Sequence, residues 1–234
     1  MRLDQYLVAY TEYTRREVYD QLNQGAIQCN GRVCQTLRIT IDPAVDRISI
    51  RGVRVTGIIG MAIYRYHKPV GVISTMTDPR GRPCLADVCR HIPEPVFPVG
   101  RLDRDTSGLL LLTNDGQLAN QILHPRYQID KQYVVQLAHA VTASDSRRLL
   151  GGLFLDDGPV RLTRLESLSK NRYRVVIAQG RNRIIRRLFD TLGYRVIALH
   201  RDTIGPIQLG RLAVGQVDAL NYQKTLTMIM ETDE

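Results

Sequence analysis

The sequence predicts an α+β fold, with a small N-terminal module over residues 1–60 and a larger domain over residues 61–234. Helical spacing of apolar residues and a strong hairpin signal lie close together in the first module. Beyond residue 61, short strands and helices are mixed along the chain, with no fixed-period repeat and no low-complexity tract. We therefore expect two structural units.

Two helices are expected at the start of the chain. The first has apolar side chains at helical spacing: Leu3, Tyr6, Leu7 and Tyr10. Thr14 and Glu17 form a capping box that begins the second helix, and Gly25 ends it. Arg15 and Arg16 stand in its first turn, where the positive helix end and their own charges suit phosphate; a solvated helix face explains them equally well.

Strands follow the helix pair. Residues 26–29 and 46–50 have strand character, and Asn30-Gly31 is typical of a two-residue hairpin turn. Residues 53–60 are small and aliphatic and include two glycines. We interpret this stretch as the junction between the two units.

The larger domain is expected to mix strands with helices. The predicted strands are 63–66, 72–74, 109–112, 131–137 and 173–177. A turn at 114–116 leads into a helix through Leu118 and Ile122, and another helix is expected over 184–192. Residues 78–83, after the strand predicted at 72–74, form a turn-rich loop.

Composition favours a polyanionic partner. The net charge is +9 with a pI near 9.6, and nearly all of the positive charge comes from arginine. Arginine offers a planar donor fork that suits phosphate and stacks on bases. No apolar run is long enough to span a bilayer, and the first residues lack a signal-peptide pattern, so we expect a cytoplasmic protein that does not bind membranes.

The cysteines occur as two pairs, Cys29 with Cys34 and Cys84 with Cys89, each with four residues between its members. Zinc sites usually have tighter pairs and often include histidine. We interpret these cysteines as small buried thiols.

A short polar loop around Asp103 runs directly into an apolar strand of four leucines. A carboxylate on a loop held by a rigid element is a common setting for a catalytic group. Arg101 and Arg104 lie close in sequence and would keep the carboxylate ionised, as a nucleophile requires. Composition alone also allows a plainer interpretation, in which Asp103, Asp105 and their neighbours cap turns.

The segment from Gly100 to Gly116 resembles the signature of the pseudouridine synthases that modify ribosomal RNA, of the RsuA/RluB type. That signature is Gly-Arg-Leu-Asp, two variable residues, Thr-Ser/Thr-Gly-Leu, an apolar strand and a Thr-X-Asp-Gly turn, and all of it is present here. The resemblance implies that Asp103 is the catalytic nucleophile. We expect a mixed, largely antiparallel sheet in this domain.

Other motifs of that family are similar in the same order: Lys68-Pro69-X-Gly71, Lys131-X-Tyr133 and the run from Gly180 to Phe189. By resemblance, Tyr133 stacks on the target base and assists proton removal, and Arg186 faces Asp103 and holds it ionised. RNA contacts are expected from basic side chains in both units: Arg15, Arg16, Lys68, Arg101, Arg104, Arg181, Arg183 and Arg187. The N-terminal module is similar to a small RNA-binding domain first seen in a ribosomal protein of the small subunit.

The resemblance implies isomerisation of a uridine in ribosomal RNA, or in a ribosomal assembly intermediate, by a monomer without metal or other cofactor. The large-subunit RNA is slightly favoured, because the turn after the leucine strand looks more like that of the large-subunit enzymes. Ile184 and Asp218 depart from the family, which usually has glutamine and arginine there. These departures concern RNA contacts and therefore the target site.

Two rival functions come from other classes. One is a noncatalytic RNA-binding factor in ribosome assembly, against which the presence of Asp103, Tyr133 and Arg186 argues. The other is a metal-dependent nuclease with Asp103, Asp105 and Asp115 as ligands. Two-metal chemistry needs converging carboxylates, and a four-leucine strand separates Asp115 from the other two.

Overall fold

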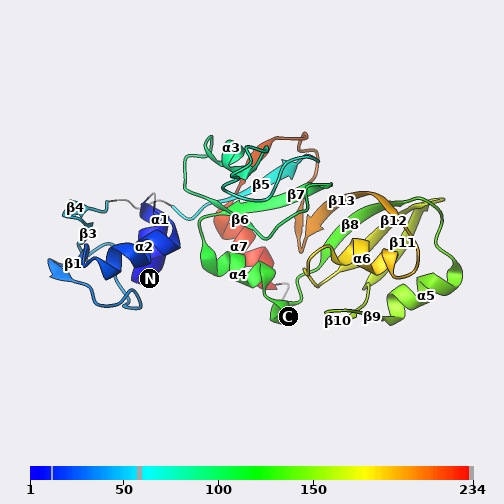
Figure 1. Ribbon diagram of the computed structural model, residues 1–234, viewed down its shortest axis with the longest axis horizontal. Helices are drawn as coiled ribbons and strands as arrows, with labels where there is room; N and C mark the ends of the chain where they lie inside the picture. Colours follow the sequence, from blue (N-terminus) through cyan, green and yellow to red (C-terminus); the bar gives the residue numbers. More distant parts are fainter. Residues whose placement is uncertain (12, 57–59, 232–234) are drawn as a thin grey trace. The chain divides into compact units, whose positions relative to one another are not determined.

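The computed structural model describes residues 1–11, 13–56 and 60–231, and its contacts divide the chain into two units (Figure 1). The first unit contains Met1–Met61 together with Ile92–Pro95, and the second contains Ala62–His91 and the chain from Val96 onward. The sequence did not show that residues 92–95 belong with the first unit. The independent folding of residues 1–60 stays a prediction.

The first unit pairs two helices with a small antiparallel sheet in the order β2-β1-β3-β4. Its elements are α1 (Leu3–Tyr10), α2 (Arg15–Asn23), β1 (Ile27–Cys29), β2 (Arg32–Val33), β3 (Ile48–Ile50) and β4 (Val53–Arg54). The predicted capping box is confirmed, since Glu17 N donates to the Thr14 hydroxyl and Glu17 accepts from Thr14 N. The predicted hairpin is also confirmed: Asn30 and Gly31 have φ of 51° and 77°, as its turn requires.

The predicted junction at residues 53–60 is wrong at its start. Val53 and Arg54 form β4, which pairs with β3 and so belongs to the sheet of the first unit. Residues 57–59 of that stretch lie outside the described part of the chain.

The second unit is built on a nine-stranded sheet with the order β11-β12-β8-β13-β7-β5-β15, to which β14 and β6 add at β13 and β7. The pairing of β13 with β7 is parallel and the other strand pairs are antiparallel. This confirms the mixed, largely antiparallel sheet and the α+β class. The strands are β5 (Ile63–Lys68), β6 (Phe97–Val99), β7 (Thr106–Thr113), β8 (Lys131–Leu137), β11 (Arg164–Ser169), β12 (Arg172–Ile177), β13 (Val196–Ile204), β14 (Ile207–Gln208) and β15 (Val217–Leu220).

Helices and a separate hairpin complete the second unit. They are α3 (Leu85–Cys89), α4 (Gly116–Leu123), the 3-10 turn η1 (Pro125–Tyr127), α5 (Ala143–Gly151), α6 (Ile184–Asp190), α7 (Tyr222–Met230) and the hairpin β9 (Leu153–Leu155) with β10 (Gly158–Val160). In Figure 1, α4 and α7 lie together beside β6 and β7, while α6 lies over the part of the sheet formed by β8, β12 and β11. None of the described helices is long and apolar enough to cross a bilayer.

Strand β7 lies at the centre of the core. Leu109, Leu110, Leu111 and Leu112 have no exposed surface, so both faces of the strand are covered. Leu109 and Leu111 pack against α4 and α7 through Leu118, Ile122 and Ile229. The loop before β7, which carries Asp103, is thus anchored to one of the most deeply buried elements of the fold.

The predicted strand at 72–74 is reduced to a single bridge between Ile73 and Cys84. The turn before it directs this segment toward the loop that carries Asp103, where Gly71 N donates to Arg104 O at 2.7 Å. Ser74 is buried and its hydroxyl donates to Leu102 O at 2.8 Å. The segment therefore supports the loop and does not extend the sheet.

Candidate active site

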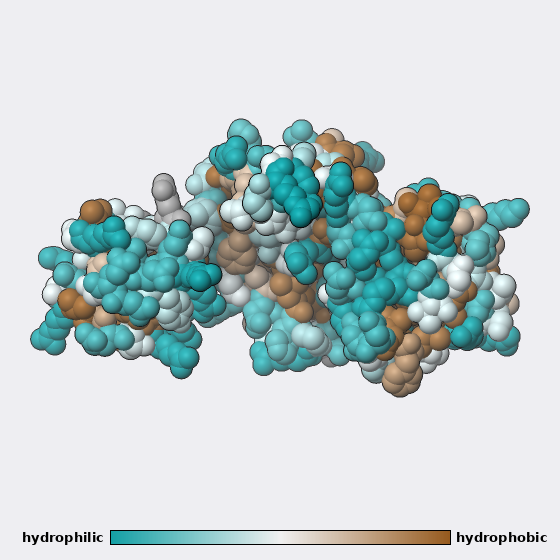
Figure 2. All heavy atoms as spheres, in the orientation of Figure 1, coloured by the Kyte–Doolittle hydropathy of each residue, from teal (hydrophilic) through white to brown (hydrophobic). Residues whose placement is uncertain are grey.

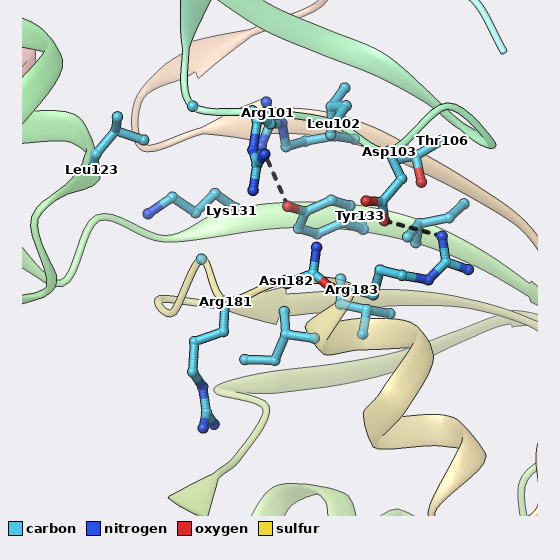
Figure 3. A pocket seen from close by; sticks show the side chains of 16 residues that line it. Arg101, Leu102, Asp103, Thr106, Leu123, Lys131, Tyr133, Arg181, Asn182 and Arg183 are labelled. Atoms are coloured by element: carbon cyan, nitrogen blue, oxygen red, sulfur yellow. Dashed lines mark hydrogen bonds and ion pairs between the residues drawn. The ribbon is translucent and has the colours of Figure 1, made fainter. Parts of the chain in front are cut away.

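A pocket of about 320 Å³ opens where five segments of the second unit meet (Figure 3). Its walls come from the loop before β7, the end of α4, the start of β8, the segment that leads into α6 with its first turn, and the middle of β13. Asp103, Tyr133 and Arg183 line it together, although they lie far apart in the sequence. In Figure 2, hydrophilic side chains gather over the segment that precedes α6.

The loop that carries Asp103 is held by hydrogen bonds from its backbone N–H groups. Leu102 N donates to the Ser74 hydroxyl at 3.1 Å, and Thr106 N donates to Asp103 O at 3.0 Å. The Asp103 side chain is about a quarter exposed, at 27%. A rigid backbone with a partly exposed carboxylate leaves room for a ligand to approach while the carboxylate keeps its position.

Arg183 is the arginine that faces Asp103: its Nη1 lies 3.7 Å from Asp103 Oδ2. It also donates to both carboxylate oxygens of Asp105, at 3.2 and 3.4 Å. Arg183 precedes α6 with φ of 47°. This left-handed conformation costs a non-glycine residue on the order of 1–2 kcal/mol, and here it aims the guanidinium at the loop.

The resemblance implied that Arg186 faces Asp103, but its hydrogen bonds go to other partners. Its Nη2 lies 3.1 Å from Asp105 Oδ2 and donates to Asp105 O at 2.9 Å, and its Nη1 donates to Val196 O at 3.2 Å. Its position on α6 directs it to the backbone after Asp103 rather than to the carboxylate itself. Burial lowers the pKa of Arg186, and the charge of Asp105 acts against this.

Asp105 is therefore the carboxylate that the two arginines share. Partial burial acts to raise its pKa, but the hydrogen bond from Arg183 and the charges of Arg186 and Arg183 act more strongly, so the net shift is downward. Asp105 stays ionised and keeps both arginines beside Asp103.

Tyr133 projects from β8 into the pocket and is almost fully buried, at 8% exposure. Its ring lies beside Asp103 in Figure 3, with Leu102 and Asn182 to either side. The Tyr133 hydroxyl accepts a hydrogen bond from Arg201 Nη1 at 3.4 Å. An aromatic ring next to a carboxylate provides a platform for a base.

Lys68 was predicted to bind RNA, and the structure contradicts this. Its side chain has no exposed surface, and its Nζ donates to Pro69 O at 2.9 Å and Thr106 O at 2.8 Å. Burial lowers its pKa to about 8, while the charges of Asp103 and Asp105 act in the opposite direction. Lys68 is a buried cation beneath the loop that carries Asp103.

Arg181 and Arg187 are held by the turn between β9 and β10. Arg181 Nη1 lies 2.6 Å from Asp157 Oδ1 and points away from the centre of the pocket (Figure 3). Arg187 donates to Asp157 at 2.7 and 2.8 Å and also contacts Asp156. The hydrogen bond from Arg187 holds the pKa of Asp157 below its usual range.

Arg101 and Arg104 are exposed on the loop that carries Asp103, so both are open to RNA. Asp115, the third carboxylate of the nuclease alternative, lies beyond the other end of β7. It caps α4 by accepting from Gln117 N and also accepts from the Tyr222 hydroxyl at 2.6 Å. The three carboxylates do not converge, and the described residues contain no cluster of three or more metal-binding side chains.

In the first unit, Arg15 and Arg16 are exposed at the start of α2. Arg15 Nη2 lies 2.8 Å from the buried Asp4, and Arg2 binds the same carboxylate at 3.0 Å. The two hydrogen-bonded arginines hold the pKa of Asp4 low despite its burial, which acts to raise it. Asp4 therefore holds Arg2 and Arg15 side by side.

Sequence reasoning did not select Arg201 or Lys131 as site residues, although both line the pocket. Lys131 is buried and donates to Ile129 O at 2.6 Å and Ala178 O at 3.1 Å. The signal that could have identified Lys131 was a lysine in a strand whose other inward-facing residues are apolar. Charged side chains are rarely buried without a reason.

Comparisons with known proteins agree with this geometry. The family model described as RNA pseudouridylate synthase matches residues 63–191, and the S4 domain model matches residues 1–43. The chain is 37% identical over 214 residues to an uncharacterized RNA pseudouridine synthase of Mycobacterium tuberculosis, covering 88% of this chain and 84% of that protein. It is 35% identical to the ribosomal large subunit pseudouridine synthase B of Bacillus subtilis, covering 88% and 86%.

A crystal structure of a pseudouridylate synthase superimposes with a TM-score of 0.69 at 28% identity, covering 98% of this chain and 99% of that one. The fold, the pocket and these relatives define an RNA-modifying enzyme with a separate RNA-binding domain. The chain belongs to the RNA pseudouridine synthase family and carries an S4 domain at its N-terminus.

Proposed function

We propose that the protein isomerises a specific uridine of large-subunit ribosomal RNA to pseudouridine, with Asp103 as the nucleophile. The observation that carries the proposal is the meeting of Asp103, Tyr133 and Arg183 in one pocket of about 320 Å³. The choice of RNA is supported by the names of the relatives from Bacillus subtilis and Pseudomonas aeruginosa, both ribosomal large subunit pseudouridine synthase B. We place this activity in the cytoplasm, carried out by a monomer.

The isomerisation breaks the bond between C1′ of the ribose and N1 of the base and forms a bond between C1′ and C5. The proton on C5 is lost and N1 gains one, so the reaction needs no oxidant or reductant. Asp103 attacks the nucleotide, Tyr133 stacks on the base and assists the proton transfer, and Arg183 and Asp105 hold Asp103 in place. The uridine must leave its stack to reach Asp103, at a cost of a few kcal/mol that RNA contacts must offset.

RNA contacts are assigned to exposed arginines on both units. Arg15 and Arg16 would meet phosphates at the start of α2, and Arg101 and Arg104 would meet the strand that enters the pocket. Arg181 and Arg187 can join only after they exchange Asp157 for phosphate.

Mapping of pseudouridine in ribosomal RNA from cells with and without the gene tests the proposal. Loss of one modified position in the large-subunit RNA, restored by the wild-type gene but not by Asp103→Asn, is the expected result. An unchanged map would favour the rival function, a noncatalytic factor in ribosome assembly. Loss of a position in the small-subunit RNA would keep the chemistry and overturn the choice of RNA.

A further inference from the structure

Arg201 is a buried cation in the wall of the pocket, and the proposed mechanism leaves it unused. The residue is 5% exposed and lies in β13. Its guanidinium donates to two neutral oxygens, Leu109 O at 2.8 Å and the Tyr133 hydroxyl at 3.4 Å. Its Nη2 is buried and has no hydrogen-bond partner among the described residues. A buried cation with neutral partners is costly, which calls for an explanation beyond packing.

The backbone places Arg201 and Tyr133 directly opposite each other. The two residues are registered partners on the antiparallel strands β13 and β8. On its other side, Arg201 is the registered partner of Gly108 on β7. A Cβ at Gly108 would lie 2.3 Å from Arg201 O, so glycine is required there for β13 to approach β7. The signature that carries Asp103 thus also makes room for Arg201.

The contact between Arg201 and Tyr133 has a fixed direction. A guanidinium has donors and no acceptor, so the phenol oxygen must accept from Arg201. The hydroxyl proton of Tyr133 is then free to point at a substrate atom. The Arg201 guanidinium carbon also lies 5.9 Å from the centre of the Tyr133 ring, within range of a cation–π contact that steadies the ring.

The charge of Arg201 also affects its surroundings. Lys131, which lines the same pocket, has its pKa lowered to about 8, first by burial and then by the charge of Arg201. Positive charge fixed in a buried wall favours negative charge on any oxygen nearby. A proton transfer from the Tyr133 hydroxyl would place such a negative charge on its oxygen.

We infer that Arg201 is a positioning residue for the isomerisation. It orients the Tyr133 hydroxyl in the pocket and stabilises the negative charge on the Tyr133 oxygen when its proton passes to N1 of the detached uracil, until the proton released from C5 restores the phenol. The inference rests on the proposed role of Tyr133. The competing explanation is that Arg201 only ties β13 to β7 through Leu109 O. The two explanations differ in whether the effect of Arg201 requires the Tyr133 hydroxyl.

A double-mutant cycle separates them. Single-turnover rates are measured at saturating enzyme, on a large-subunit RNA fragment that carries the target uridine, for Arg201→Gln, Arg201→Lys, Tyr133→Phe and Arg201→Gln/Tyr133→Phe. Arg174→Gln is the matched control, because Arg174 lies on β12, pairs with Glu166 at 3.1 Å, and is the registered partner of Val134 rather than Tyr133. Circular dichroism and thermal melting check that each variant is folded.

Arg201→Gln should slow the single-turnover rate by about ten- to a hundred-fold, the range for the loss of one charged hydrogen bond. The same change should cost less than about three-fold in the Tyr133→Phe background, since coupled residues are not additive. Arg201→Lys should recover part of the rate because it keeps the charge. Equal losses in both backgrounds would overturn the inference. A wild-type rate for Tyr133→Phe with a slow Arg201→Gln would also overturn it, without affecting the assignment of Asp103.

A second measurement does not depend on turnover. In protein labelled with ¹³C at the tyrosine Cζ, the Tyr133 signal is assigned by its absence from the Tyr133→Phe protein. The signal should move in Arg201→Gln and stay in place in Arg174→Gln, because only the first change removes a hydrogen bond to the hydroxyl. An unmoved signal in folded Arg201→Gln protein would refute the contact.

Discussion

Arg183 reaches across the pocket to Asp103, with 3.7 Å between Nη1 and Oδ2, and the same guanidinium binds Asp105 at 3.2 Å. Arg186 also binds Asp105, through both its carboxylate and its backbone oxygen. Asp105 therefore links two arginines to the proposed nucleophile. This gives each of the two arginines a different expected effect on catalysis.

Arg183→Gln should slow single turnover by at most about five-fold, because the ion pair with Asp103 is open to solvent and such pairs contribute no more than about 1 kcal/mol. Arg186→Gln should slow it by about a hundred-fold, since Arg186 is only 12% exposed and its loss frees the backbone after Asp103. Arg186→Lys should recover little, because one ammonium cannot replace a planar fork that reaches Val196 O and Asp105 together. Single-turnover rates at saturating enzyme measure all three. A larger loss in Arg183→Gln than in Arg186→Gln would contradict the arrangement.

Release of Arg181 and Arg187 should strengthen RNA binding. In Asp156→Asn/Asp157→Asn protein, both arginines lose their carboxylate partners and become available to phosphate. The slope of log affinity against log salt should steepen by up to about two units, as two added phosphate contacts predict. Filter binding at several salt concentrations measures the slope, with Asp145→Asn on α5 as the control. An unchanged slope would mean that these arginines do not reach RNA.

Arg15→Ala/Arg16→Ala should have the opposite effect on the same slope. Both side chains are exposed at the start of α2, and the loss of two phosphate contacts should flatten the slope by up to about two units. Turnover on saturating RNA should be retained, because the pocket lies in the second unit. A slope equal to that of the wild type would place these arginines on an idle solvated face.

Lys68 should make the stability of the protein depend on pH. Its folded pKa is about 8 against an ordinary 10.5, so between these values the unfolded chain binds a proton that the folded chain does not. The cost of the buried charge is fully present below pH 8 and disappears as the pH rises toward 10.5. Wild-type stability relative to Lys68→Met should therefore rise by about 3 kcal/mol over this window, at about 1.4 kcal/mol per pKa unit. Urea unfolding of both proteins at several pH values measures the difference. A flat difference would show that Lys68 titrates normally.

The sequence predicted the elements that have a strong local signal. The strand at 131–137 was predicted with the bounds of β8, and every second residue along it is buried. The capping box of α2 and the hairpin at Asn30-Gly31 are local as well, and each is set by a few side chains. The position of Asp103 at the start of the leucine strand followed from the signature and the apolar run after it.

Pairings between distant segments could not be predicted in the same way. The partner of Arg186 depends on where α6 lies relative to the loop before β7, which no local pattern encodes. The burial of Lys68 depends on the start of β7, which supplies Thr106 O as its acceptor. Asp218, a departure from the family, is the registered partner of Arg65 on β5 and forms an ion pair with it at 2.7 Å. An arginine at 218 would place two like charges opposite each other, so the departure has a local electrostatic reason.

The central claim is that the Asp103 carboxylate carries the chemistry, and Asp103→Asn tests it most directly. The amide has nearly the same shape and is a poor nucleophile, so the variant should fold and bind RNA like the wild type. Asp105→Asn is the matched control, which should lose part of the rate through Arg183 and Arg186 but keep turning over. Pseudouridine formed in a single turnover should be undetectable for Asp103→Asn and measurable for Asp105→Asn. Turnover by pure, folded Asp103→Asn protein would contradict the account.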